Sequence, residues 1–196
     1  MSKIKPLWIV IGVVVLILLW VMGSYNGLVN SRETVDQSWA DVEAQYQRRL
    51  DLIPNLVSTV EGAVDFEKET QTQIAALRTS AQSAKTALAN AQTGGERIAA
   101  VKQAEGVSDS FTSLNINVEN YPQLKATENF LSLQDELAGT ENRVAVARQR
   151  YNEATRNYNV KTKRFPSNII AGMFGFDEEE FFEAEEDAAE APKVEF

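Results

Sequence analysis

The chain has 196 residues, a net charge of −9 at pH 7, and neither cysteine nor histidine. This composition excludes disulfide bonds, thiolate nucleophiles and the usual zinc ligands, and it removes the side chain that exchanges protons most readily near neutral pH. Residues 177–196 hold ten acidic residues and one lysine, so the rest of the chain is neutral. Because the sequence has no basic patch, we expect no nucleic-acid partner.

The first apolar segment, residues 7–22, contains sixteen residues without a charge. Counted with Ile4 and Gly23, it approaches the ~20 residues that a helix needs to cross a bilayer. Aromatic side chains near its two ends favour the membrane–water interface. The segment therefore predicts a membrane anchor over residues 1–24, with the lipid bilayer as its partner. The residues expected to contact lipid are Leu7, Trp8, Ile9, Val10, Leu16, Leu19 and Trp20.

A cleaved signal peptide is the alternative for this segment, because a basic start and an apolar stretch of ~7–15 residues also typify secretory signals. Val21 and Gly23 loosely fit the small residues of a cleavage site. We favour a retained anchor, since the apolar helical pattern continues through Tyr25 and Leu28.

Basic residues beside the segment bear on its orientation in a cell membrane. Lys3 and Lys5 predict that the N-terminus stays inside and that the bulk of this single-pass chain lies on the outer, periplasmic or extracellular, side. Arg32 follows the segment and opposes this orientation, which therefore stays open.

Four amphipathic stretches follow, and they predict an all-α fold in which an up-and-down four-helix bundle of long antiparallel helices follows the membrane helix. The predicted helices cover residues 25–63, 66–92, 96–118 and 122–161, within a bundle domain at 25–164. In the first, apolar residues recur about every 3.6 residues on both sides of Pro54, which predicts one kinked helix. Residues 93–95 (TGG) are expected to end the second helix, because glycine accepts left-handed geometry.

The fourth stretch has the most regular pattern. Its residues form two rows with a seven-residue period, one of large and one of small side chains. The row of mostly small side chains lies at residues 126, 133, 140, 147 and 154. Large and small rows side by side are typical of a helix that packs closely on other helices. The large row consists of Phe130, Leu137, Val144, Tyr151 and Tyr158.

Several segments carry a family resemblance: residues 39–42 (WADV), 49–57 (RLDLIPNLV), 119–126 (ENYPQLKA), 130–159 and 165–171 (FPSNIIA). In these segments the chain resembles the LemA family of bacterial membrane-anchored helical proteins, and the similarity runs nearly end to end. The resemblance implies an N-terminal membrane helix, an up-and-down bundle and no established biochemical activity. It also implies bacterial envelope biology, because family members are often associated with membrane proteases or stress responses.

No arrangement of residues predicts catalysis. The acidic runs at 178–180 and 185–187 lack the alternating spacing and the glycine of a calcium loop. Ser80, Ser83 and Lys85 lie in an alanine-rich helical stretch without the turn that exposes a nucleophile. We therefore expect no enzyme, with no catalytic, cofactor-binding or metal-binding residue and no cofactor.

The favoured function is a non-enzymatic, membrane-anchored scaffold or adaptor of the bacterial envelope that self-associates. The alternative is a ligand-sensing bundle that signals to a membrane partner, which requires polar groups that converge inside the bundle. Tyr46, Tyr121 and Tyr151 are the candidates for such groups, although we expect their hydroxyls to reach the surface.

A final expectation concerns surfaces for a partner. Because the first and fourth helices are predicted to be the longest, only this pair runs side by side near the membrane, and its apolar rows need another cover. The segment at 165–196 consists of an apolar stretch and an acidic tail. We expect residues 165–182 to order only on a neighbour, either another subunit or the bilayer surface, and we favour a groove on an adjacent subunit. A disordered tail is the alternative. The residues expected to contact a homo-oligomer or another membrane protein are Val35, Trp39, Val144, Tyr151, Tyr158, Ile169, Ile170, Met173, Phe174 and Phe176.

Overall fold

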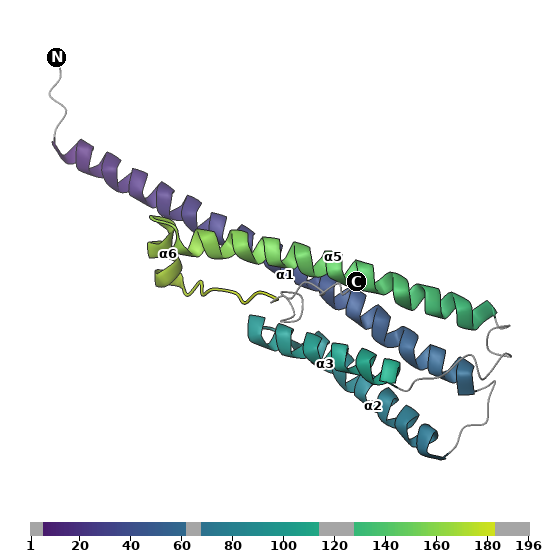
Figure 1. The fold of residues 1–196 in the computed structure, drawn as a ribbon. Helices are drawn as coiled ribbons and strands as arrows, with labels where there is room; N and C mark the ends of the chain where they lie inside the picture. The colour runs from purple at the N-terminus through teal and green to yellow at the C-terminus, as the bar shows by residue number, and fades with distance from the viewer. Residues whose placement is uncertain (1–5, 62–67, 114–127, 183–196) are drawn as a thin grey trace, which may run out of the picture.

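The computed structural model describes residues 6–61, 68–113 and 128–182, and every regular element in these ranges is an α-helix (Figure 1). The predicted all-α fold, with a long apolar N-terminal helix followed by a helical bundle, is confirmed. The predicted tip after Glu61, the end of the third helix and the start of the fourth lie outside the described residues. The elements are α1 (Pro6–Glu61), α2 (Lys68–Asn90), α3 (Gly94–Ser113), α5 (Glu128–Lys163) and α6 (Ser167–Phe174).

Helix α1 is continuous over 56 residues, about 84 Å at ~1.5 Å per residue. It passes through Pro54 without ending, as the periodicity on both sides of this proline predicted. The apolar row of its bundle part is buried, whereas the side chains of its N-terminal part are exposed. One helix therefore contains both the candidate membrane segment and the central element of the bundle.

The bundle is built on the pair formed by α1 and α5, which lie side by side over most of the length of α5 (Figure 1). Helices α2 and α3 pack on each other and on α1. Small residues of α5, Ala147 and Ala154, alternate with Val144, Tyr151 and Tyr158 in the core, so α5 approaches α1 closely. Phe130, the first member of this row, has a side chain outside the described part.

Residues 93–95 do not end α2 as predicted; they begin α3. The backbone N–H of Glu96 donates to Thr93 Oγ1 at 3.4 Å, and the Glu96 carboxylate accepts the N–H groups of Gln92 at 2.9 Å and Thr93 at 3.0 Å. This reciprocal arrangement is a capping box. The bonds from Gln92 and Thr93 hold the pKa of Glu96 below its usual value. In the Thr-Gly-Gly-Glu sequence, Thr93 and Glu96 cap the N-terminus of a helix, so the two glycines lie in the first turn of α3 and not at the end of α2.

Two further elements follow α5. Helix α6 packs against both α1 and α5 at the end of the bundle where α1 emerges (Figure 1). Residues 177–182, which we name the C-terminal strap, then run back along α5 toward the start of α3 (Figure 1).

Candidate membrane-facing surface and the C-terminal strap

The N-terminal part of α1 extends beyond the bundle (Figure 1). All seven residues expected to contact lipid are exposed, with exposed fractions from 39% at Trp20 to 67% at Leu16. By length and composition this helix can cross a membrane, and none of its most apolar window is buried against the chain itself. An exposed apolar surface of this size marks a contact site for a membrane or another protein.

Burial begins one to two turns after this apolar part. Leu28 is buried in a small cluster with Ile170 and Ala171 of α6. The ring of Tyr25 lies 5.0 Å from that of Phe174 and 5.6 Å from that of Phe176, both in edge-to-face geometry. Helix α6 therefore covers α1 where α1 enters the bundle.

Helix α6 starts and stops by local chemistry. The Ser167 hydroxyl lies 2.6 Å from the carbonyl of Lys161, in the last turn of α5, and 2.8 Å from that of Arg164, which also accepts the N–H of Asn168 at 2.9 Å. Gly175 adopts φ 71°, the left-handed geometry that ends a helix at little cost for glycine. The N–H groups of Gly175 and Phe176 both reach the carbonyl of Ala171. This stop reverses the chain and directs the strap back over the bundle.

Two asparagines of α5 hold the strap. Asn159 donates its amide to the carbonyl of Glu179 at 2.8 Å and accepts the N–H of the same residue at 3.0 Å. Asn152 makes the same pair of bonds with Phe182, both at 2.9 Å. Seven residues of helix span ~10.5 Å and three residues of extended chain span ~10 Å, so the two spacings match. Each asparagine thus replaces the neighbouring strand that an extended segment would otherwise require.

The strap also closes the core. Phe182 is buried, its ring lies 5.0 Å from that of Tyr151, and the Arg148 guanidinium lies 5.2 Å from the Phe182 ring centroid. At the other side the strap passes so close to Gly94 that a Cβ there would lie 2.9 Å from the backbone nitrogen of Glu180. Glu179 and Glu180 therefore approach the N-terminus of α3, whose dipole favours negative charge.

A polar layer lies inside the bundle beside the strap. Arg97 of α3 is buried, pairs through Nη2 with Asp36 Oδ1 at 2.5 Å and lies 5.5 Å from the Trp39 ring centroid. Desolvation lowers the pKa of Arg97, but Asp36 outweighs it and leaves the pKa raised. Burial raises the pKa of Tyr151, and nearby Arg97 partly opposes this effect. Among the described residues, the Tyr151 hydroxyl and the Nε and Nη1 atoms of Arg97 find no hydrogen-bond partner of good geometry.

A second polar group connects three helices. Tyr46 of α1 donates to Glu105 Oε1 of α3 at 2.8 Å, and Arg148 of α5 donates to the same oxygen at 2.7 Å. Burial, followed by the charge of Glu105, raises the pKa of Tyr46. Tyr46 and Tyr151 are therefore buried, and the expectation that their hydroxyls reach the surface is wrong for both. Tyr121 lies outside the described residues.

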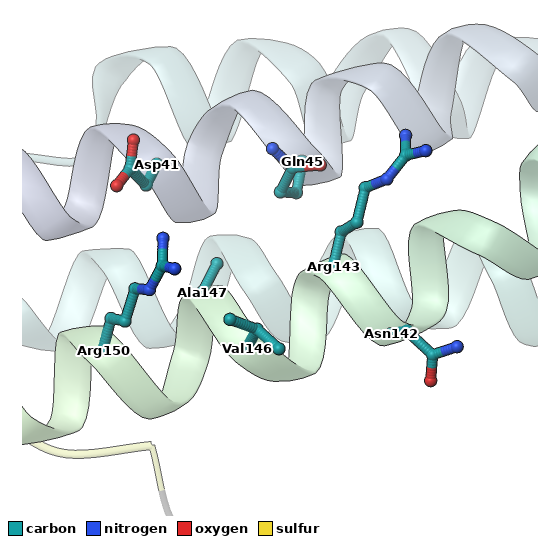
Figure 2. A pocket seen from close by; sticks show the side chains of 7 residues that line it. All are labelled: Asp41, Gln45, Asn142, Arg143, Val146, Ala147 and Arg150. Carbon is teal, nitrogen blue, oxygen red and sulfur yellow. The ribbon is translucent and has the colours of Figure 1, made fainter.

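An open groove of about 390 Å³ lies between α1 and α5. Figure 2 shows Arg143 and Arg150 reaching from α5 toward α1, whereas Asn142 points away. Gln45 has a buried Oε1 without a protein hydrogen-bond partner, and Val146 is 46% exposed. The groove thus presents polar groups and charges of both signs, with Asp41 of α1 opposite Arg150 of α5 (Figure 2). Within the described ranges, no group of three or more acidic residues is arranged to hold a metal ion.

A model of the LemA family matches residues 38–196.

The chain belongs to the LemA family. Protein LemA of Metamycoplasma hominis is 22% identical over 165 residues, which cover 84% of this chain and 71% of that protein. Magnetosome proteins MamQ 2 and MamQ 1 of Paramagnetospirillum magneticum are each 29% identical over 89 residues, 45% of this chain and 32% of each relative. The chain thus spans about a third of the length of these magnetosome proteins.

The structure places the residues predicted for partner contact in two groups. One group is covered by the LemA-family chain itself, because α2, α3 and the strap bury the rows that two helices alone would leave open. The expectation that these rows need another subunit is wrong. This group comprises Val35, Trp39, Val144, Tyr151 and Tyr158, and Ile170 of α6 is buried separately, beside Leu28 of α1.

The other group stays accessible. Phe176 is partly buried against Tyr25, whereas Ile169, Met173 and Phe174 are exposed on α6. The expectation that residues 165–182 order only on a neighbour, another subunit or the bilayer surface, is also wrong, because α6 packs on its own α1 and α5. The sequence signal for this docking was the pair Asn152 and Asn159, spaced by seven residues beside an apolar seam.

Proposed function

We propose that this LemA-family chain is a non-enzymatic, membrane-anchored scaffold or adaptor of the bacterial envelope. The continuity of α1 supports this proposal, because one helix joins the exposed apolar part to the centre of the bundle without a break. A joint of this kind makes the direction of the bundle follow that of the membrane helix. The basic residues before the apolar part favour the outer side for the bundle.

The anchor is tested on protein purified from native membranes. We expect the chain to resist extraction at alkaline pH and to retain its full mass of 21.8 kDa. Cleavage before Ser24, which removes the apolar part, would contradict a retained anchor. Replacement of Leu16 and Leu19 by aspartate serves as the matched control, because it should release the bundle from the membrane without a change in the core.

The adaptor role requires a partner, which a second copy of the chain or another membrane protein can provide. The groove between α1 and α5 supports a docking surface with acidic groups on the partner, since Arg143 and Arg150 both reach into it. A photo-crosslinking amino acid at Val146 should yield one dominant adduct in intact cells. The variant R143E/R150E should lose this adduct while its thermal stability stays unchanged. An unchanged adduct, or none in the native chain, contradicts this docking surface.

A ligand-sensing bundle is the second candidate, and the polar layer at Arg97 supports it. A buried guanidinium with two unpartnered nitrogens beside a tyrosine hydroxyl is suited to a small anion. Inorganic phosphate should then raise the melting temperature of the full chain in detergent, and R97K should abolish the shift. No shift in the native chain would reject this candidate and leave the scaffold proposal intact.

A further inference from the structure

We propose that the outer face of α6 lies in the boundary between the headgroups and the hydrocarbon of the bilayer, as a second membrane contact of the chain. This inference rests on the proposed membrane anchoring by α1. It assigns the exposed apolar residues of α6 to lipid rather than to another protein.

The first support is the distribution of apolar residues around α6. Phe165 lies in the turn before α6, whereas Ile169 and Met173 are four residues apart and so lie on one face of the helix. Their exposed fractions are 76%, 49% and 72%. Ile170 and Ala171, on the opposite face, are buried against the bundle. The helix is apolar on both faces, and the chain covers only one of them.

The second support is the position of α6 along α1. Residues 7–22 span ~24 Å at ~1.5 Å per residue, whereas the hydrocarbon core is ~30 Å thick. The missing ~6 Å corresponds to four residues. Whether they lie before Leu7 or after Met22, Tyr25 falls within one helical turn of the hydrocarbon boundary. The ring of Tyr25 contacts Phe174 at 5.0 Å, which sets α6 at this depth.

The third support is the path of the acidic residues. An acidic segment beside α6 would be repelled by anionic lipid headgroups. The chain reverses at Gly175, however, and the strap meets Asn159 first and Asn152 second. Because α5 runs toward the membrane end from residue 152 to 159, the strap carries its carboxylates away from the bilayer. Glu178 is in addition paired with Lys163 at 2.7 Å.

The exposed face is also continuous with the surface of α1 that lipid would cover. Val21 packs against the cluster of Leu28, Ile170 and Ala171, so α6 adjoins the apolar part without an intervening polar element. A bilayer that surrounds residues 7–22 therefore reaches α6 without any rearrangement of the chain. A second copy of the chain would need a separate complementary surface at the same height.

The test uses the full chain, which has no native cysteine, in lipid nanodiscs sorted for one copy per disc. Single cysteines at Met173 and Ile169 carry an environment-sensitive bimane label. Leu16→Cys reports the lipid interior, and Val146→Cys, exposed to 46% on α5, reports a site remote from lipid. Discs of phosphatidylcholine with brominated acyl chains are compared with discs of the unbrominated lipid. We expect loss of emission at Leu16, Met173 and Ile169, and no loss at Val146.

The outcomes separate this inference from the anchoring on which it rests. Quenching at Leu16 without quenching at Met173 and Ile169 overturns the membrane contact of α6 and leaves the anchor in place. Absence of quenching at all four positions overturns both. A shielded label at Met173 that appears only in discs with two copies, without quenching by bromine, assigns this face to a second subunit and overturns the inference. Thermal melts of each labelled variant confirm the fold.

Discussion

At the scale of single residues, the strap depends on side chains that act as backbone surrogates. Asn152 offers one donor and one acceptor to the backbone C=O and N–H of Phe182, and Asn159 does the same for Glu179. An aspartate retains only the acceptor, and a leucine retains neither, so the amide is required for both bonds. The residues that hold the strap are thus few, and their removal has a predictable effect.

Replacement of Asn159 by alanine should detach the strap. Two hydrogen bonds are lost, each with a net contribution of about 0.5–1.5 kcal/mol, so we expect a loss of about 1–3 kcal/mol in unfolding free energy. Urea denaturation in detergent measures this loss, and limited proteolysis should show new cleavage within residues 177–182. Asn142→Ala, on the exposed side of the same helix, should change neither property. Equal protease resistance of N159A and the native chain would rule out the clamp.

Gly94 should not tolerate a larger side chain. A Cβ at this position lies 2.9 Å from the Glu180 nitrogen, so Gly94→Ala should displace the strap and lower the melting temperature. Gly106 lies inside the same helix, where an added Cβ would meet no atom within 4 Å, and Gly106→Ala should stabilise α3 by up to about 1 kcal/mol. Opposite signs for the two substitutions are the expected result. A stabilising G94A would show that the close approach is not required.

At the scale of elements, the N-terminus of α3 is capped by its own side chains and approached by the strap. Glu96 in its first turn accepts the N–H groups of Gln92 and Thr93, which precede the helix, and donates its own N–H to Thr93. The strap brings further carboxylates close to this end of the helix. The beginning of α3 is therefore more acidic than its own sequence indicates.

The capping box predicts a dependence of stability on pH. The folded state lowers the pKa of Glu96, so this group stabilises the fold above its unfolded pKa of roughly 4.3, and the contribution is lost as the pH falls through the folded value. The native chain should therefore be more stable than E96Q at pH 7, and the difference should shrink below about pH 4. Denaturant titrations at the two pH values measure it, with Glu153→Gln on α5 as the control for net charge. A difference that does not vary with pH would exclude the carboxylate as its origin.

The helices of the bundle could be predicted from the sequence because their apolar side chains recur with the helical period. Val35, Trp39 and Val42 lie on one face whatever their partner, so their burial follows from spacing alone. The identity of the covering element does not follow, because α6 and the strap dock through single residues rather than a repeated pattern. A sum of apolar burial and chain entropy alone predicts that this docking is only marginally stable. That sum omits the four hydrogen bonds that Asn152 and Asn159 make with the strap.

At the scale of the whole molecule, the two halves of the bundle are closed by different means. At the far end, α2 and α3 cover α1, whereas near the apolar part of α1 the cover comes from α6 and the strap. The C-terminal part of the chain is thus a structural component of the membrane-proximal half.

Removal of residues 165–196 should destabilise the bundle. The truncation uncovers Leu28 and Tyr151, which pack on α6 and on Phe182. We expect a lower melting temperature in detergent and a lower urea midpoint. A chain that ends after Phe182 serves as the control, because it retains the strap. Equal stability of the native chain and the chain that lacks residues 165–196 would show that α6 and the strap add no net stability.

The unbroken course of α1 has a mechanical consequence. From Tyr25 to Glu61 the helix extends ~54 Å at ~1.5 Å per residue, as a stiff rod whose lower end is held in lipid if the proposed anchoring is correct. Transmembrane helices tilt by roughly 0–40° to match the local bilayer thickness, and a change of ~10° would move the far end of the rod by about 9 Å. A small adjustment inside a thinner or thicker membrane would thus appear at the α2–α3 end as a sideways displacement several times larger than the thickness change itself.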